Sequence, residues 1–275
     1  MRQLVLDQMP DLEGRIILSG SQFRYVVNVL RSEEGLLIDT RLPDGSLRKA
    51  KIEKIDRVNK HIFLLCSLED SNLDSSNLAV GSSMPPLTSL CENFVSIVLF
   101  QWILKGPKMD QVIRQATETG VTLIVPVAGD RCLSRDPESL GLSKTSRWER
   151  IVTEARQQSG SPVSTIIHQP VLPEEILGVW KGKKDGKSGL PFVLTEAPLA
   201  RKSLHEYCYG VHSHAAIAIG PEGGMSPREL ELLDTAGFYR IHFNTNILRA
   251  ETAALYGIAA VQTLLTESEK WQLKE

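Results

Sequence analysis

The sequence predicts an α/β domain with a largely parallel sheet, preceded by a smaller β-rich domain. In the second part of the chain, short apolar runs alternate with segments of helical periodicity, the pattern of a parallel sheet with crossover helices. These runs lie near residues 95, 122, 166, 192, 217 and 240. The first 70 residues instead carry short strand patterns separated by turn residues. We therefore expect a first domain at 1–70, a Ser-, Asn- and Pro-rich linker or insertion at 71–93, and a second domain at 94–275.

The composition is that of an ordinary soluble globular protein. Of the 275 residues, 42% are hydrophobic and 23% are charged. No apolar run approaches the ~20 residues of a membrane span, and Met1 to Leu4 lack the apolar core of a secretory signal. The 4 cysteines are scattered without a C-x-x-C pair, which favours reduced thiols over a zinc site or disulfides. We expect a cytoplasmic protein with no membrane and no metal.

The charge balance limits how the chain could bind nucleic acid. The formal net charge is −2 and the pI is about 6.3, whereas a general nucleic-acid binder is usually basic. Any such binding must rest on a local patch or on shape. The basic, glycine-rich stretch 181–187 is interpreted most simply as a solvated loop.

The first domain shows strand and turn patterns around one short helix. The helix is expected over 21–30, with Phe23, Val26, Val27 and Leu30 on one stripe and Arg31 at its end. Strands are expected at 15–18, 35–39, 49–55 and 60–65, with a turn at 43–46.

Helices in the second domain are bounded by recognisable signals. Gly120 should stop a helix over 109–119, and Ser226, Pro227 and Glu229 form the start of a capped helix that should end at Gly237. Further helices are expected over 144–159, 173–180 and 250 to about 268. The last carries a small-residue stripe of Ala253, Gly257 and Ala260, which fits either a subunit contact or a close contact within the chain.

A glycine loop follows the most apolar predicted strand. The run 215–219 is uncharged, as in strands buried on both faces, and Gly220-Pro221-Glu222-Gly223-Gly224 comes next. Such a loop is either a tight turn or a place where backbone approaches a ligand at the carboxyl end of a parallel strand. It matches neither the dinucleotide nor the P-loop motif, and Glu222 would repel phosphate.

A second loop, ahead of the last helix, carries charged residues. Arg249 precedes this helix and Glu251 lies in its first turn. Taken singly, Glu251 is explained as a favourable charge at a helix N-terminus and Arg249 as a surface residue. Two such loops at neighbouring strand ends favour a site.

Together the two loops resemble those of a known family. Gly220-Pro221-Glu222-Gly223-Gly224 and Leu248-Arg249-x-Glu251-Thr252-Ala253 resemble the motifs of the 16S ribosomal RNA uracil-N3 methyltransferases, the RsmE-type members of the SPOUT superfamily. Three further segments resemble that family and extend the likeness over nearly the whole chain. They are Tyr25-x-x-Asn28-Val29-Leu30-Arg31, Lys105-Gly106-x-Lys108-Met109-Asp110 and Asp130-Arg131-Cys132.

The resemblance also implies a knotted fold, an oligomeric state, a cofactor, a partner and catalytic residues, none of which the residue pattern alone indicates. It implies a SPOUT domain with a carboxyl-terminal trefoil knot, a PUA-like β-barrel as the first domain, and a homodimer. It implies S-adenosylmethionine as cofactor and small-subunit ribosomal RNA as partner. The catalytic candidates are Arg249, which would stabilise the uracil anion, Glu251, which would orient Arg249 or its loop, and Glu222, which would handle the proton.

The other site residues carried over from the family bind cofactor or RNA. The cofactor-binding candidates are Leu194, Thr195, Glu196, Ile219, Gly220, Pro221, Glu222, Gly223, Gly224, Asn244, Asn246, Ile247, Leu248 and Thr252. The RNA-binding candidates are Arg31, Lys105 and Lys108, where lysine charge adds to a helix N-terminus in the last two cases.

The chain departs from the family pattern at three positions. Asn244 and Asn246 stand where the family usually has Gly and Arg, and Ser161 stands where it usually has Arg. The lost positive charges fit a different RNA contact. Two alternatives therefore stay open: a SPOUT methyltransferase with another RNA target, and a noncatalytic RNA-binding or ribosome-assembly protein.

Overall fold

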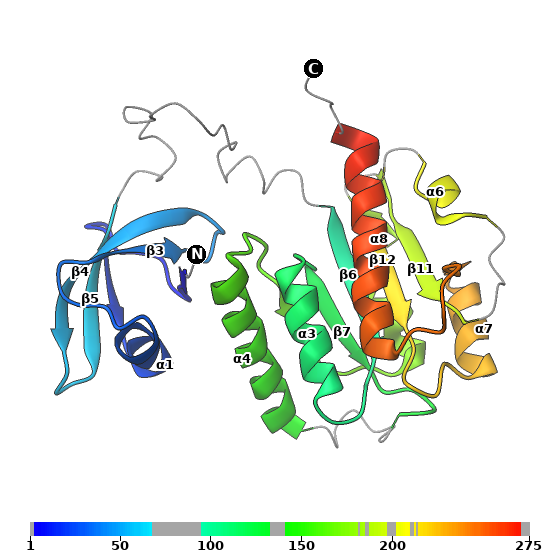
Figure 1. Cartoon of the computed structure of the whole chain (residues 1–275), viewed down its shortest axis with the longest axis horizontal. Coiled ribbons are helices and arrows are strands. Elements are labelled where there is room, and N and C mark those ends of the chain that lie inside the picture. Colours follow the sequence, from blue (N-terminus) through cyan, green and yellow to red (C-terminus); the bar gives the residue numbers. More distant parts are fainter. Residues whose placement is uncertain are drawn as a thin grey trace. The chain divides into compact units, whose positions relative to one another are not determined.

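The computed structural model describes residues 3–67, 95–132, 141–180, 182–184, 187–196, 202–209, 212 and 214–270. These residues form two compact units (Figure 1). The first contains 3–67 together with Arg156–Ser164, and the second contains the other described residues from Val95 onward. The predicted linker at 71–93 lies outside the described residues.

The first unit is built on a five-stranded sheet in the order β1-β3-β4-β5-β2. Its strands are β1 (Leu4–Val5), β2 (Arg15–Leu18), β3 (Leu37–Arg41), β4 (Leu47–Asp56) and β5 (His61–Cys66). Neighbours run antiparallel except for β1 and β3. The strands predicted from alternation are confirmed within a few residues, and the two-residue β1 was not predicted because it is too short to show a period.

One face of this sheet packs against the first helical segment. The core includes Ile16 and Leu18 of β2, Ile52 of β4 and Leu64 of β5, closed by Val26. The predicted single helix over 21–30 is corrected in its geometry. An α-helix, α1 (Gly20–Arg24), passes into a π-helical turn, η1 (Tyr25–Val29), whose end is marked by the Leu30 N–H donating to the Tyr25 carbonyl at 2.9 Å.

A buried arginine explains why Arg156–Ser164 belongs to the first unit. Arg41 is 1% exposed and donates to Gln3 Oε1 at 3.3 Å, the Gly45 carbonyl at 2.9 Å and the Gly160 carbonyl at 3.2 Å. The Gln3 N–H also donates to the Gln157 carbonyl at 3.2 Å. Buried guanidinium groups need such acceptors, so these bonds tie the segment in place.

The second unit confirms the predicted α/β architecture. Its described residues form a six-stranded sheet in the order β13-β11-β12-β6-β7-β8, and every neighbouring pair is parallel. The strands are β6 (Ser96–Trp102), β7 (Leu123–Val127), β8 (Ile166–Ile167), β11 (Leu190–Leu194), β12 (His214–Ile219) and β13 (Tyr239–Ile241). The loop predicted at 181–187 is partly wrong, because Lys183–Lys184 (β9) and Lys187–Ser188 (β10) pair as a short antiparallel ribbon.

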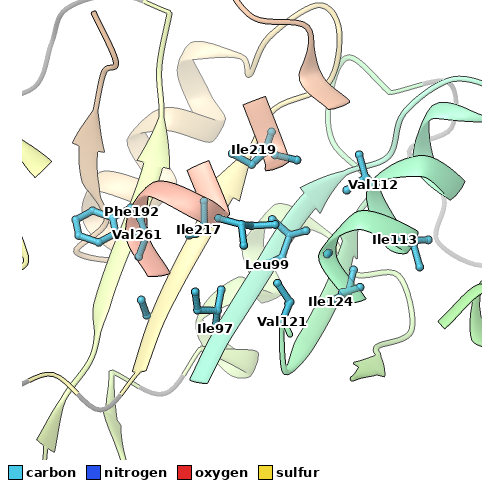
Figure 2. Packing of buried hydrophobic residues seen from close by; sticks show 14 of the residues in the cluster. Ile97, Leu99, Val112, Ile113, Val121, Ile124, Phe192, Ile217, Ile219 and Val261 are labelled. Atoms are coloured by element: carbon cyan, nitrogen blue, oxygen red, sulfur yellow. The ribbon is translucent and has the colours of Figure 1, made fainter. Parts of the chain in front are cut away.

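Helices cover both faces of the parallel sheet. On one face, α3 (Lys108–Glu118), α4 (Gly141–Ser159) and α8 (Ala250–Lys270) share one core cluster with alternate residues of β6 and β12, among them Leu99 and Ile217 (Figures 1 and 2). On the other, the 3₁₀ turn η3 (Pro173–Glu175), α5 (Ile176–Val179) and α7 (Pro227–Thr235) border the cluster that holds Phe100 and Ala218. The small α6 (Leu204–Tyr207) lies between β11 and β12 in the chain. No helix among the described residues combines the length and apolar character that crossing a membrane requires.

Two sequence signals in this unit are confirmed in detail. Ser226 caps α7 by accepting from the Glu229 N–H, and Glu229 closes the capping box. Gly237 follows the helix with φ of +81°. In α8, a Cβ added at Gly257 would lie 3.4 Å from the Leu194 side chain, so at Gly257 the small-residue stripe serves a close contact within the chain.

Candidate functional site

A cavity of about 560 Å³ opens at the carboxyl ends of β11 and β12. Three stretches of the chain line it, within 194–196, 219–225 and 242–250. Lys108, Arg131, Leu230 and Ala253 complete the lining. The volume is that of a small-molecule site, and the carboxyl edge of a parallel sheet is where such sites form.

Most of the sequence-predicted cofactor residues line this one cavity. They are Leu194, Thr195, Glu196, Ile219, Gly220, Pro221, Glu222, Gly223, Gly224, Asn246, Ile247 and Leu248. Arg249 also lines it. Asn244 and Thr252 do not, and both are exposed. The roles of all these residues stay predictions.

The glycine loop is folded tightly against its neighbours. The Gly224 N–H donates to the Pro221 carbonyl at 2.9 Å, and Gly224 has φ of +69°, a conformation that side chains rarely adopt. A Cβ at Gly220 would lie 3.2 Å from the Met225 side chain. The loop therefore presents backbone, with little side-chain bulk, to the cavity.

Glu222 joins this loop to the start of α3. Its Oε1 accepts from the Lys108 ammonium at 3.1 Å and from the Lys105 backbone N–H at 3.2 Å. Partial burial raises the pKa of the Glu222 carboxyl. Hydrogen bonds from its own backbone, Lys108 and Lys105, together with the Lys108 charge, outweigh burial and hold this pKa below its ordinary value. The carboxylate is therefore ionised at neutral pH and a weak proton acceptor.

Glu251 sits behind Lys108, in the first turn of α8. The residue is 8% exposed, and its Oε2 lies 4.0 Å from the Lys108 ammonium. That oxygen is buried and accepts no hydrogen bond within the described residues. Lys108 thus faces one carboxylate from the glycine loop and one from the first turn of α8, and Glu251 itself does not line the cavity. The RNA-phosphate contact expected for Lys108 stays a prediction.

Arg131 is a cavity residue that sequence reasoning missed as a site residue. Its guanidinium donates to the Gly223 carbonyl at 2.6 Å, which holds the glycine loop at Gly223. The family-like segment Asp130-Arg131-Cys132 is the sequence signal that points to Arg131.

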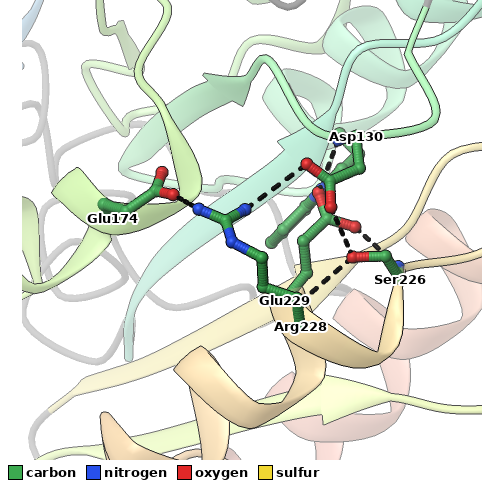
Figure 3. A network of polar contacts seen from close by, with 6 residues as sticks. Asp130, Glu174, Ser226, Arg228 and Glu229 are labelled. Carbon is green, nitrogen blue, oxygen red and sulfur yellow. Dashed lines mark hydrogen bonds and ion pairs between the residues drawn. The ribbon is translucent and has the colours of Figure 1, made fainter.

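A buried carboxylate anchors the end of the glycine loop (Figure 3). Glu229 is fully buried. Its Oε1 accepts from Trp102 Nε1 and from the Asp130 N–H, both at 2.8 Å, and its Oε2 accepts from the Ser226 N–H at 2.6 Å. The capping carboxylate of α7 therefore also binds β6 and the loop after β7.

Room for this carboxylate depends on Gly129. A Cβ there would lie 2.2 Å from Trp102 Nε1 and 2.3 Å from Glu229 Oε1, distances that real atoms do not reach. Around the network, Ser226 Oγ donates to Asp130 Oδ2 at 2.7 Å, and Arg228 pairs with Asp130 and Glu174 (Figure 3).

The third stretch is tied to β11. The Thr195 N–H donates to the Ile241 carbonyl at 3.0 Å, and His242 Nδ1 lies 3.1 Å from the Thr195 carbonyl, which it reaches as a donor. Beyond His242, residues 244–247 are exposed. The cavity wall at this side is therefore open to solvent.

The remaining RNA candidates lie on exposed surface. Arg31 is exposed, at the end of the π-helical turn, with φ of +52°. Lys105 is exposed ahead of α3. Among the described residues, no group of three or more His, Cys, Asp or Glu side chains is placed to hold a metal ion.

A parallel sheet with a cavity at its carboxyl edge is typical of enzymes that bind a small molecule. Comparison with known proteins identifies which class of enzyme this is. Residues 91–262, more than half of the chain, match the model of the RNA methyltransferase domain family. A protein from Aquifex aeolicus named ribosomal RNA small subunit methyltransferase E is 32% identical, over 83% of this chain and 96% of its own. The chain therefore belongs to the ribosomal RNA small subunit methyltransferase E family.

Other relatives extend the likeness along the whole chain. Ribosomal RNA small subunit methyltransferase E 2 from Borreliella burgdorferi is 28% identical over 97% of this chain and 99% of its own. A Legionella pneumophila methyltransferase solved with bound S-adenosylmethionine has a TM-score of 0.74 and 25% identity, covering 96% of this chain and 98% of its own. A Neisseria gonorrhoeae member of the family, at 24% identity and a TM-score of 0.72, shares the fold.

Proposed function

We propose that this protein uses S-adenosylmethionine to methylate N3 of a uridine in 16S ribosomal RNA of the small ribosomal subunit. The observation that carries the proposal is the cavity at the carboxyl ends of β11 and β12 in a member of this RNA methyltransferase family. Its lining combines three stretches of chain distant in sequence, and relatives along the whole chain carry the methyltransferase name.

The residues present fit this cofactor. The cavity is large enough for a nucleoside with an amino-acid tail, and the glycine loop offers backbone groups at close range. Glu196 and Glu222 in the lining suit a cationic ligand and oppose a phosphate. Backbone of 194–196, 219–224 and 246–248 would hold the cofactor, which supplies an electrophilic methyl group when bound.

The chain must then deal with the uracil, whose N3 loses a proton. The negative charge that develops is shared with O2 and O4, and a cation aimed at such charge is a large catalytic contribution. Arg249 lines the cavity from its exposed loop and takes this role. Alignment of the two reactants supplies much of the remaining acceleration, and the base must be unstacked to enter.

The two carboxylates take different supporting roles. Glu222 faces the cavity but is ionised and paired with Lys108, so it receives the proton only weakly or through solvent. Glu251 is buried in the first turn of α8, two residues after Arg249, and orients the loop that carries Arg249.

We also propose that the second unit carries a carboxyl-terminal trefoil knot and that the first unit is an RNA-binding barrel. β13 lies beyond β11 at the edge of the sheet, whereas α8 contacts β12 and β6. The chain between them must cross the carboxyl end of β11, where Ile241 and His242 bind Thr195. This course supports a knotted carboxyl terminus. The strand-rich first unit, with exposed Arg31, supports a PUA-like domain that contacts RNA.

A homodimer that works in the cytoplasm completes the proposal. Ile247, in the loop before α8, is 79% exposed and Tyr256 of α8 is 44% exposed, and exposed apolar side chains of this kind support contact with a second copy. Sedimentation of the purified protein at several concentrations tests the dimer.

One observation favours a second candidate, a methyltransferase of the same class with another RNA target. Asn246 lines the cavity where the family pattern usually has Arg, which changes the charge beside the base to be methylated. The target nucleotide would then differ while the chemistry stays the same.

Two measurements test the proposed function. Calorimetric titration with S-adenosylmethionine should give saturable binding that is lost when Gly223 is replaced by Trp, because the side chain would enter the cavity lining. Incubation with small subunits from cells lacking the enzyme, followed by mass spectrometry of the 16S RNA, should find one N3-methyluridine. Binding of the cofactor with methylation elsewhere favours the second candidate, and no cofactor binding even with RNA present contradicts both.

A further inference from the structure

The Lys108 ammonium contacts two carboxylates, one from the glycine loop and one from the first turn of α8. Lys108 is the first residue of α3, and its ammonium lies 3.1 Å from Glu222 Oε1 and 4.0 Å from Glu251 Oε2. Glu222 belongs to the glycine loop and Glu251 to the first turn of α8. A single cation therefore faces one carboxylate from the glycine loop and one from the first turn of α8.

Glu251 depends on this cation more than Glu222 does. Its Oε2 is buried and lacks a hydrogen-bond donor within the described residues, and the residue is only 8% exposed. A buried carboxylate is tolerated when a cation or donors compensate it, and the free-energy cost rises steeply when they are removed. Lys108 is the cation that the described ion pairs give it. Without Lys108, two carboxylates would face each other with no charge between them.

Lys105, three residues earlier, differs from Lys108 in the contacts of its side chain. It is exposed, and only its backbone N–H contacts Glu222. Among the described residues its ammonium forms no ion pair. Lys105 is free to meet an RNA phosphate, whereas the Lys108 ammonium is turned to the cavity and engaged there.

We propose that Lys108 is a positioning residue that joins the glycine loop to the first turn of α8 and so holds Arg249 in register with the cofactor site. This inference rests on the proposed function and replaces the RNA-phosphate role that the sequence gave Lys108. Lys108 acts through Glu222 and Glu251, and its contribution is to fix two carboxylates that would otherwise repel each other and separate the loops.

The experiment compares Lys108→Met, Lys108→Arg, Lys105→Met and the double variant Lys108→Met with Glu251→Gln. Lys108→Met should weaken S-adenosylmethionine binding about tenfold, equivalent to about 1.4 kcal/mol, because Glu222 loses a charge-assisted hydrogen bond. Lys108→Arg should recover most of this loss because it keeps the charge. The double variant should recover at least part of it, because Glu251→Gln removes the charge left without a partner.

Lys105→Met separates the two lysine roles. It should leave cofactor affinity unchanged, raise KM for RNA and reduce the salt slope of RNA binding by about 1. If Lys108→Met behaves in the same way, Lys108 is a phosphate ligand and the proposal is overturned. The proposal is also overturned if Glu251→Gln adds to the loss in cofactor affinity instead of relieving it.

A measurement without cofactor keeps this inference separate from the proposed function. Hydrogen exchange at the amides of 250–254 should speed up in Lys108→Met, stay near the parent rate in Lys108→Arg and recover in the double variant, with far-UV circular dichroism confirming that each variant is folded. Unchanged exchange in Lys108→Met overturns the positioning role. Absence of cofactor binding by the parent protein would count against the proposed function alone.

Discussion

The two loops that face each other across the cavity are built in opposite ways. The glycine loop is held by side chains from three other parts of the chain: Arg131 bonds Gly223, Lys108 pairs with Glu222, and Glu229 closes its far end. The loop at 243–249 is held mainly by its own backbone, as in the Thr245 N–H bond to the Phe243 carbonyl at 2.7 Å. Its residues 244–247 are exposed.

Under the proposed function, this difference would suit one cavity to two ligands of different kinds. A pocket for a constant small molecule gains affinity from a wall that is fixed before binding. A surface that meets a folded RNA must adapt, and loops with few contacts adapt most readily. We infer that the glycine loop is shaped for the cofactor and that the loop at 243–249 adjusts to RNA around Arg249.

The largest expected effect comes from removing the Glu229 carboxylate, which anchors the end of the glycine loop. Glu229→Ala should lower the free energy of unfolding by about 3–5 kcal/mol, because the Trp102, Asp130 and Ser226 donors lose their acceptor and each buried unpaired donor costs about 1–3 kcal/mol. Urea unfolding followed by tryptophan fluorescence measures it. Glu231→Gln, an exposed change on the same helix, should stay within about 0.5 kcal/mol. Equal stability of Glu229→Ala and the parent would contradict the role given to the network.

Removing the cation of the open loop should affect catalysis without affecting the fold. Arg249→Ala should reduce kcat about 10²- to 10³-fold, the range for losing one group that stabilises developing charge. Cofactor affinity and unfolding should change little, because Arg249 is exposed on its loop. Single-turnover methylation and calorimetry on the same preparation measure both. Parallel loss of cofactor affinity would move Arg249 from catalysis to binding.

Adding a methyl group beside Glu229 should lower the free energy of unfolding less than removing the Glu229 carboxylate does. Gly129→Ala places a methyl group against Trp102 and Glu229 and should cost about 1–3 kcal/mol, as overpacking usually does. Gly178→Ala is the matched control, since a Cβ there meets nothing within 4 Å. Thermal unfolding of the two variants should separate them clearly, and a shift of equal size in both would show that Gly129 is not specially constrained.

The smallest effect is expected from adding charge to the open loop. Asn246→Arg should increase RNA affinity a few-fold at low salt and steepen the salt dependence by about one unit of slope. Stability should stay within about 0.5 kcal/mol because the position is exposed. Filter binding of 16S RNA fragments at several salt concentrations measures the slope. A loss of stability would mean that the loop is more tightly packed than its contacts indicate.

What the sequence could predict depends on how far apart in the chain the interacting residues lie. Buried strands and the capping box of Ser226 and Glu229 were predictable because each depends on residues close together in the chain. The second function of Glu229 was not, because its partner Trp102 is 127 residues away. The pattern around Lys108 shows a helix N-terminus and a positive charge, from which a phosphate contact is predicted. It does not show the two carboxylates that the fold brings to Lys108, and the phosphate contact stays a prediction.

Other differences between expectation and structure arise from local geometry. The apolar stripe of Phe23, Val26, Val27 and Leu30 repeats as in an α-helix, yet the chain widens into a π-helical turn there, and hydrophobic spacing does not distinguish the two. The paired residues Lys183–Lys184 and Lys187–Ser188 carry no apolar period at all. Likeness to a motif predicts a cofactor contact for Asn244, and this stays a prediction; its exposed position outside the cavity lining depends on the path of the loop.

The order of strands in the parallel sheet also has a consequence for how this protein folds. The central strand β12 pairs with β6, and Gln101 of β6 donates to the carbonyl of Ile219, 118 residues later. Pairings of such long range form slowly, because the entropy of closing the intervening chain must be lost first. The glycine loop follows β12 directly, so the cavity cannot exist until this late step is complete. A ligand that binds there selects molecules that have finished folding and withdraws them from the pool of partly folded chains.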